Sequence, residues 1–329
     1  MEHILEVKNL NVSFKSYLGT VRAVQGVDFV LDQKETLAMV GESGCGKTVT
    51  AKSILRLFGR TTGTIADGSQ ILFEGKDILK MDKNELSDLR GAGISMIFQD
   101  SMTSLNPTMR VGKQIAECIR LHNRVSRQEA MQRACELLRL VEIPNPEERL
   151  KNYPHQMSGG MRQRVMIAMA LSCNPKILIA DEPTTALDVT IQAQILDLMK
   201  KIQQEEGMSI LLITHDLGVV AEMCSRVIVM YAGEIVEEAP VDILFNHPSH
   251  PYTIGLIASV PKLGSGVKVL PSIPGSVPDL SMLPKGCRFA PRCKYATERC
   301  HNEEPSLFEV SPQQKCRCWL AEPAGKEDK

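Results

Sequence analysis

The sequence lacks any apolar run that approaches the length of about 18 residues at which a helix can cross a bilayer. Its first residues, MEHILE, have neither the basic region nor the apolar core of a secretory signal. It also lacks an excess of basic charge, since 38 Lys and Arg residues against 39 Asp and Glu residues give a formal net charge of -1. We therefore expect no transmembrane span and no nucleic-acid partner, and a cytosolic chain that reaches membranes only through partners.

What is present is typical of a soluble globular protein, with 43% hydrophobic and 23% charged residues in a chain of 329, long enough for two domains. Ten cysteines fall into two sets. Cys45, Cys118, Cys135, Cys173 and Cys224 are scattered, and we expect them to be ordinary buried or half-buried side chains.

The other five cysteines crowd together in a proline-rich C-terminal stretch. Their spacing is Cys287-x5-Cys293-x6-Cys300 followed by Cys316-x-Cys318. In a reducing compartment such crowding favours a metal site over disulfides, although the short C-x2-C pairs of common zinc ribbons are missing.

A glycine-rich octapeptide is the strongest motif in the chain. Residues 41–48 read GESGCGKT and match the phosphate-binding template G-x-x-x-x-G-K-[ST]. The glycines let successive N–H groups point at phosphate oxygens, Lys47 adds a charge at the β- and γ-phosphates, and the Thr48 hydroxyl suits Mg²⁺. An apolar run at 36–40 predicts the preceding strand, and helical spacing at 49–58 predicts the following helix.

Two further apolar strands end in polar residues. Residues 177–182 (ILIADE) end in two carboxylates, of which Asp181 suits a magnesium ion and Glu182 can orient an attacking water. Residues 210–216 (ILLITHD) place His215 where it can meet a γ-phosphate. A structural histidine is the alternative for His215, and the order of the motifs favours the functional one.

Weaker signals surround these motifs. Ser158 can cap a helix over 165–171, and the glycines of MSGGM (157–161) leave its first N–H groups open to an anion. An ordinary helix start is the alternative for this stretch. Phe14 and Tyr17 lie on the expected turn between strands at 4–7 and 21–31. An aromatic side chain here can stack on an adenine ring, or it can pack in the core at the end of a strand. Other strands are expected at 71–73, 93–98, 227–231 and 234–236, and an inserted helical block at 111–141.

In this order the motifs resemble those of ATP-binding-cassette (ABC) transporter ATPases, most closely the peptide/nickel importer subgroup of the dipeptide or oligopeptide permease type. The resemblance covers essentially the whole chain. It implies an α/β P-loop NTPase fold with a RecA-like core, an antiparallel β subdomain and a helical subdomain at about 100–172. It further implies a nucleotide-binding domain at 1–235 and a C-terminal extension at 236–329.

The resemblance also implies roles for individual residues. Catalysis falls to Glu182, His215 and the Q-loop residue Gln99, and the magnesium ligands are Thr48, Gln99 and Asp181. The implied ATP-binding set is Phe14, Tyr17, Gly41, Ser43, Gly44, Cys45, Gly46, Lys47, Thr48, Val49, Gln99, Ser158, Gly159, Gly160, Asp181 and Asp188. Ser158–Gly160 matches the signature motif of the family. Three residues depart from the usual pattern, namely Met157 and Met161 beside this signature and Cys45 in place of serine.

Several stretches are similar to the peptide-importer subgroup in particular, namely QDSMTSLNP (99–107), YPHQ (153–156), HPYT (250–253) and IPGSVP (273–278). Several ATPases of this subgroup carry a 4Fe-4S cluster, which implies Cys287, Cys293, Cys300 and Cys318 as its ligands, with Cys316 as the alternative to Cys318. Zinc, or a tail of free thiols or disulfides, remains the alternative to iron.

The resemblance implies partners as well. Two cassettes, related or identical, pair head to tail so that each ATP lies between the 41–48 loop of one chain and Ser158–Gly160 of the other. Two membrane permease subunits and an extracytoplasmic peptide-binding protein complete the importer, and the chain sits peripherally on the cytoplasmic face. The cargo alternatives are dipeptides, longer peptides and nickel.

Two other classes of function remain. A soluble cassette protein acting on nucleic acid or ribosomes usually has two cassettes or a coiled-coil insertion, and neither is found in the sequence. A binding module with damaged catalysis is disfavoured by the intact Glu182 and His215.

Overall fold

The structure is a computed structural model that describes residues 3–16, 19–58, 63–99, 104–185, 187–260 and 271–323. Tyr17, one of the two candidate adenine-stacking aromatics, lies outside these ranges, as do Ala186 and residues 100–103 after Gln99. The chain divides into two compact units, one built from Leu31–Glu35 and Lys80–Ile213, the other from His3–Val30, Thr36–Leu79 and Thr214–Lys329. Within the described ranges, no helix combines the length and the apolar character that a membrane crossing requires.

The first unit contains three parallel strands. β7 (Ile94–Ile97), β8 (Ile177–Asp181) and β9 (Ser209–Ile213) pair in the order β7-β8-β9. Every residue of β8 and β9 is buried, as expected for continuous apolar strands covered on both faces. Asp181 ends β8 opposite Ile213, so it stands at the carboxyl edge of the strands, where α/β proteins bind ligands.

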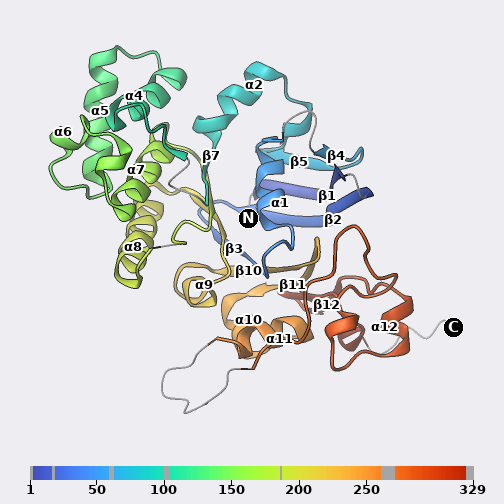
Figure 1. Ribbon diagram of the computed structural model, residues 1–329. Helices are drawn as coiled ribbons and strands as arrows, with labels where there is room; N and C mark the ends of the chain where they lie inside the picture. Colours follow the sequence, from blue (N-terminus) through green and yellow to red (C-terminus); the bar gives the residue numbers. More distant parts are fainter. Residues whose placement is uncertain are drawn as a thin grey trace. The chain divides into compact units, whose positions relative to one another are not determined.

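Helices make up the rest of this unit. They are α2 (Lys83–Asp88), the π-helical turn η2 (Leu89–Gly93), α4 (Val111–His122), α5 (Arg127–Leu140), α6 (Pro146–Arg149), the 3₁₀ turn η3 (Pro154–Gln156), α7 (Gly159–Leu171) and α8 (Val189–Glu206). Helices α4, α5 and α7 contact one another and form a helical group (Figure 1). The predicted block at 111–141 is thus two helices, because Ser126 and Glu129 form a capping box that starts α5 afresh.

The second unit contains an antiparallel sheet of the order β2-β1-β5-β6, with β4 also paired to β1. Its strands are β1 (His3–Ser16), β2 (Gly19–Asp32), β4 (Thr64–Ile65), β5 (Gln70–Phe73) and β6 (Lys76–Asp77). The expectation that Phe14 lies on a turn is wrong, because β1 continues through Ser16. The longer strand finds hydrogen-bonding partners in β4, where Val12 pairs with Ile65.

The same unit contains the strands that carry the phosphate-binding loop. β3 (Thr36–Val40) pairs in parallel with β10 (Arg226–Tyr231), which forms the predicted hairpin around Gly233 with β11 (Glu234–Pro240). α1 (Lys47–Ile54) begins earlier and ends earlier than the predicted helix at 49–58. It ends there because Arg56 takes a left-handed φ of 49°, which does not continue a helix.

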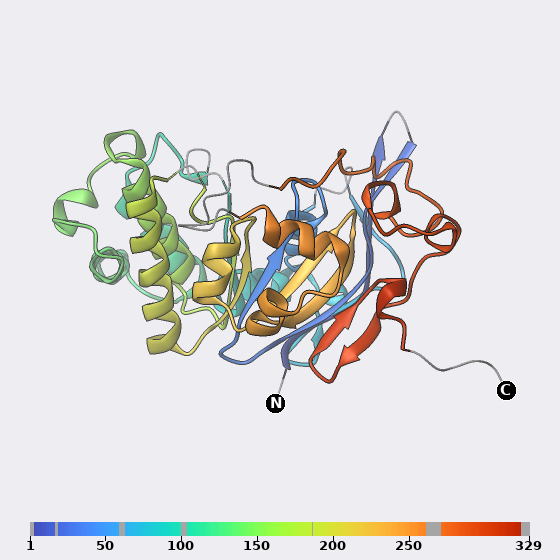
Figure 2. The same cartoon turned by 90° about the horizontal axis from the view of Figure 1, so that it is seen from below.

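The C-terminal part of this unit is more regular than its sequence indicated. It contains α9 (Leu217–Met223), α10 (Val241–Asn246), α11 (Pro251–Ala258), α12 (Glu298–Asn302), the 3₁₀ turns η4 (Ala290–Arg292) and η5 (Trp319–Ala321), and the strands β12 (Phe308–Ser311) and β13 (Gln314–Cys316). A further 3₁₀ turn, η1 (Ile78–Lys80), precedes α2 in the chain. The hairpin β12–β13 adds to the edge of β11 (Figures 1 and 2), so ladder hydrogen bonds order a segment that has little apolar periodicity.

Candidate functional site

The loop between β3 and α1 has a shape that only glycine permits at two positions. Gly41 and Gly46 have φ values of 149° and 109°, which residues with a Cβ rarely adopt. A Cβ would lie 2.2 Å from the Met230 carbonyl oxygen at Gly41 and 2.7 Å from the Ala23 carbonyl oxygen at Gly46. The close approach of neighbouring backbone thus requires both glycines of the template, and the predicted loop is present.

Lys47 places its charge inside this loop. Its Nζ donates to the carbonyl oxygens of Gly41, at 2.6 Å, and Glu42, at 3.0 Å, and the residue is 6% exposed. Cys45 lies beside it with Sγ at 3.7 Å, and burial raises the pKa of this thiol, which therefore stays neutral. The buried ammonium gives the loop a fixed positive charge, as anion binding needs.

The predicted carboxylates of the first unit sit in different environments. Asp181 is buried, whereas Glu182 is half-buried and accepts hydrogen bonds on Oε2 from Gln99 Nε2, at 2.8 Å, and from Thr185 Oγ1, at 2.9 Å. Glu182 also has a left-handed φ of 48°, while its N–H donates to the Ile213 carbonyl oxygen at 2.8 Å. Such a conformation is unfavourable for glutamate, and the structure here turns its side chain toward Gln99.

The signature stretch forms a helix start in the same unit. The Ser158 hydroxyl accepts a hydrogen bond from the Met161 N–H at 3.3 Å, and α7 begins at Gly159, earlier than the predicted helix at 165–171. A Cβ on Gly160 would lie 2.7 Å from Ile191 Cγ2, so any larger residue there would force the Ile191 side chain to move. Ser158 and Gly159 are exposed and leave the helix N-terminus accessible.

Three other predicted site residues lie in different local environments. Asp188 caps α8, with Oδ1 accepting from the Ile191 N–H at 3.0 Å. His215 is exposed just before α9. Phe14 packs edge-to-face on the half-buried Phe58 with ring centroids 5.5 Å apart, and its contact with adenine stays a prediction.

Four of the five clustered cysteines line one cavity. The cavity has a volume of about 240 Å³, and Cys287, Cys293, Cys300 and Cys318 are in its wall, together with His250, Phe289 and Trp319. Burial raises the pKa of Cys287 to about 12 and also raises the pKa of the Cys293 and Cys318 thiols. The fifth, Cys316, is buried in β13 and is not part of this wall.

The thiols around this cavity do not converge on one point. Within the part of the chain that the structure describes, no three His, Cys, Asp or Glu side chains are placed so that they hold a single metal ion. All five are free cysteines. The predicted metal site therefore has suitable donors around one cavity, without the geometry of a mononuclear site.

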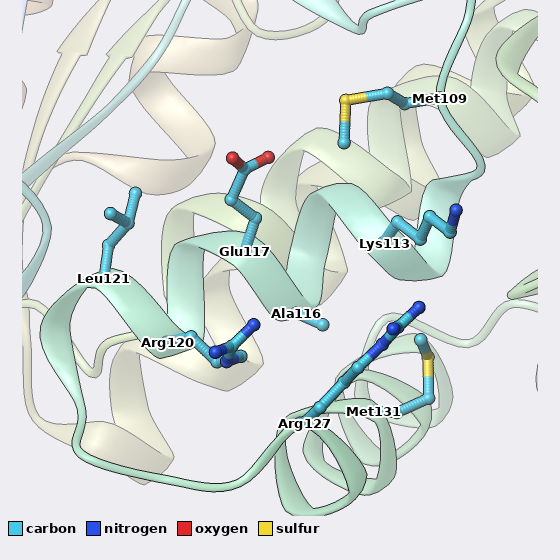
Figure 3. Close-up of a pocket in the computed structure, with 8 residues that line it drawn as sticks. All are labelled: Met109, Lys113, Ala116, Glu117, Arg120, Leu121, Arg127 and Met131. Atoms are coloured by element: carbon cyan, nitrogen blue, oxygen red, sulfur yellow. The ribbon is translucent and has the colours of Figure 1, made fainter.

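A separate groove of about 420 Å³ lies between α4 and the start of α5 (Figure 3). Lys113, Glu117 and Arg120 come from α4, and Arg127 extends from the start of α5 toward the Lys113 end of α4. None of the predicted nucleotide-site residues lines it. The groove is therefore not part of the phosphate-binding apparatus.

One contact of the phosphate-binding loop was not predicted from the sequence. The Tyr252 hydroxyl accepts a hydrogen bond from the Glu42 N–H at 2.8 Å, across 210 residues of sequence. The only sequence signal for it is that Tyr252 lies in the stretch 250–253, which is similar to peptide importers.

The chain is similar to known transport proteins over nearly its whole length. A family model described as ABC transporter matches residues 24–185, and one described as the C-terminal region of oligopeptide/dipeptide transporters matches residues 236–300. The oligopeptide transport ATP-binding protein OppD of Bacillus subtilis (strain 168) is 56% identical over 97% of this chain and 89% of its own length. The chain belongs to the ABC transporter family. The dipeptide transport ATP-binding protein DppD of the same organism is 52% identical over 97% of this chain and 95% of its own length.

Solved structures agree with membership of the ABC transporter family. The ATP-binding cassette MJ0796, in a dimeric post-hydrolysis state bound to ADP and Pi, matches with a TM-score of 0.65 and 28% identity over 72% of this chain and 98% of that one. CbiO1 of Clostridium perfringens, part of the transporter complex cbiONQ, matches with a TM-score of 0.64 and 27% identity over 75% and 92% of the two chains. The predicted P-loop ABC fold is confirmed, and the chain is an ATPase of this family.

Proposed function

We propose that this protein is the ATP-hydrolysing subunit of an ABC importer for dipeptides or oligopeptides, bound peripherally at the cytoplasmic face of the cell membrane. The observation that carries the proposal is the 56% identity to an oligopeptide transport ATP-binding protein over 97% of the chain. The match of residues 236–300 to the C-terminal region of oligopeptide/dipeptide transporters supports a peptide cargo over the nickel alternative. It also supports a division between a nucleotide-binding domain at 1–235 and an extension at 236–329.

The partners belong to the same proposal. They are two transmembrane permease subunits, a second ATPase subunit, related or identical, and an extracytoplasmic binding protein that selects the cargo. Gln99 and the segment after it transmit closure of the cassettes to the permease subunits. The match to a dimeric cassette structure supports the pairing of two ATPase chains.

The predicted phosphate-binding, magnesium-binding and catalytic residues have distinct roles in this mechanism. The loop N–H groups of Gly41–Thr48 and the Lys47 ammonium bind the β- and γ-phosphates, and Thr48, Asp181 and Gln99 would hold the magnesium ion. When bound, that ion neutralises charge on the phosphate oxygens. Glu182, held by Gln99, orients the attacking water and accepts its proton, while His215 donates a hydrogen bond to the γ-phosphate.

The second cassette completes the site. Ser158, Gly159 and Gly160 of one chain present the exposed N-terminus of α7 to the nucleotide bound by the partner, and Asp188 lies at the same interface. ATP thereby holds the dimer closed, and loss of the γ-phosphate contacts lets it open.

Transport by the reconstituted importer tests the function. With its permease subunits, second cassette and binding protein in proteoliposomes, ATP hydrolysis should rise several-fold when dipeptides or oligopeptides load the binding protein, and labelled peptide should accumulate inside. Nickel ions and a free amino-acid mixture serve as cargo controls. Stimulation by nickel alone would replace the peptide proposal with the nickel alternative, and co-purification with nucleic acid would contradict the transport role itself.

We further propose that Cys287, Cys293, Cys300 and Cys318 bind a 4Fe-4S cluster that ties the C-terminal extension together. The common cavity of these four thiols supports the proposal and favours Cys318 over Cys316 as the fourth ligand. A zinc ion needs four donors within about 2.3 Å of one point, whereas a cluster spreads its thiolates further apart, so the cavity suits zinc less well. Because burial raises the pKa of Cys287, Cys293 and Cys318, loading should release protons and become more favourable as the pH rises.

Metal analysis of protein purified without oxygen tests the cluster. We expect roughly four iron atoms per chain and a broad absorbance near 400 nm. Cys318→Ser should lose most of the iron, whereas Cys316→Ser, the matched control, should keep it. A colourless protein with one zinc per chain would contradict iron, and retention of iron by Cys318→Ser with loss by Cys316→Ser would exchange the fourth ligand.

A further inference from the structure

An ion pair joins the C-terminal extension to the phosphate-binding loop. Arg292, the last residue of η4, donates from Nη1 to Glu42 Oε2 at 2.6 Å and from Nη2 to Glu42 Oε1 at 3.0 Å. The two partners are 250 residues apart in the sequence. Two parallel hydrogen bonds of this kind fix both the position and the orientation of a carboxylate.

The arginine is held from several sides. Its side chain is 5% exposed, and its guanidinium carbon lies 5.7 Å from the centroid of the Tyr231 ring and 5.9 Å from that of Phe289. Its Nε donates to the Pro274 carbonyl oxygen at 2.8 Å. An arginine restrained in this way loses little conformational freedom when it pairs with Glu42, so the pair is pre-formed.

The backbone of Glu42 is held as well. The hydroxyl of Tyr252 accepts its N–H, and the Tyr252 ring packs on Tyr231 with centroids 4.6 Å apart. The side chain and the backbone of the second loop residue are therefore both fixed by residues of the C-terminal part of the same unit.

The charge of Glu42 makes this arrangement matter for nucleotide binding. Glu42 lies between Gly41 and Ser43, in a loop whose N–H groups and Lys47 attract polyphosphate. An unpaired carboxylate there repels phosphate, since like charges at short range in a partly desolvated site oppose each other strongly. The guanidinium of Arg292 neutralises that carboxylate, and its two hydrogen bonds fix the carboxylate in the plane of the guanidinium.

We propose that Arg292 is a positioning residue for the nucleotide site, which neutralises and orients Glu42 so that the loop accepts the phosphates of ATP. The proposal rests on nucleotide binding by residues 41–48. Arg292 itself does not touch the nucleotide. The C-terminal extension thereby contributes directly to nucleotide affinity, in addition to any role in metal binding.

Nucleotide binding by Arg292→Gln tests the proposal, with the full chain and Mg-ATP as the probe. We expect about a tenfold weaker affinity for Mg-ATP and a raised KM, with kcat changed far less, because Glu182 and its hydrogen bonds are untouched. The same substitution in a Glu42→Gln background should change the affinity by less than about twofold, since no carboxylate is left to neutralise. Arg299→Gln, on the same segment but 45% exposed and paired with Glu303 and Glu322, is the matched control and should bind ATP like the wild type.

Different results would contradict the role of Arg292 and nucleotide binding itself. An Arg292→Gln chain that binds Mg-ATP as well as the wild type would overturn the proposal, and so would an equal loss of affinity in the Glu42→Gln background, which would show a merely structural role. If Arg292→Gln does not fold, Arg292→Lys is the second variant, since it keeps the positive charge and the aliphatic part of the side chain but cannot make two parallel hydrogen bonds. We expect Arg292→Lys to bind ATP several-fold more weakly than the wild type. Wild-type affinity in Arg292→Lys would then overturn the proposal, whereas failure of the wild-type chain to bind ATP would refute nucleotide binding itself.

Discussion

Glu182→Gln is expected to bind Mg-ATP with nearly wild-type affinity and to hydrolyse it roughly 10²- to 10⁴-fold more slowly, the range that loss of one general base produces. The carboxamide has the shape of the carboxylate and can still accept the Gln99 hydrogen bond, which measures 2.8 Å in the wild-type protein. It cannot take the proton of the attacking water. Binding and chemistry should therefore separate in this variant.

The two effects are measured by equilibrium binding of a labelled nucleotide and by single-turnover release of phosphate, in the presence of the second cassette. Glu205→Gln, an exposed glutamate of α8, serves as the control for loss of one negative charge and should hydrolyse ATP normally. Near-normal turnover in Glu182→Gln would show that another group activates the water. Loss of nucleotide affinity would instead assign Glu182 to binding.

Lys47→Ala is expected to weaken ATP binding by roughly 10²-fold, because one charge-assisted interaction with phosphate contributes about 1.5–3 kcal/mol and its loss also removes the buried positive charge of the loop. The ammonium contacts the carbonyl oxygens of Gly41 and Glu42, so the substitution also removes hydrogen bonds that hold the loop closed. Both effects act on binding. The affinity of Lys47→Ala for ATP should therefore fall more than its affinity for adenosine, which has no phosphate.

Isothermal titration with ATP and with adenosine measures this difference. Lys52→Ala, in the last turn of the same helix, removes an equal charge outside the loop and is the control. Unchanged ATP affinity in Lys47→Ala would contradict the phosphate assignment of the loop. An equal loss for ATP and adenosine would point to unfolding of the loop.

Most residues of the candidate site could be proposed from the sequence because they form short motifs whose chemistry is local. The template G-x-x-x-x-G-K-[ST] already requires glycine at positions 41 and 46. The structure gives the reason, because a Cβ at these positions would clash with the carbonyl oxygens of Met230 and Ala23. The carboxylates at the end of an apolar strand were predicted in the same way, because a buried strand must end at an edge of its sheet.

Element boundaries were predicted less well. Strand β1 runs well beyond the apolar residues 4–7, because pairing with β4 supplies hydrogen-bonding partners that the residue pattern of one strand does not reveal. Helix α7 begins at Gly159, since the Ser158 cap starts it before the apolar residues that indicated a helix. In the C-terminal extension, the edge of β11 gives β12 and β13 an order that their composition did not indicate.

By itself the sequence determined the family, the glycine-rich loop at 41–48, the order of the candidate motifs and the set of thiols near the C-terminus, because each of these is encoded by residues close together in the chain. Only the tertiary structure decided which cysteines share a cavity, which side chain holds Glu182, and that Arg292 and Tyr252 restrain Glu42. Contacts across 83 to 250 residues depend on how strands and turns pack, and no spacing in the sequence specifies them.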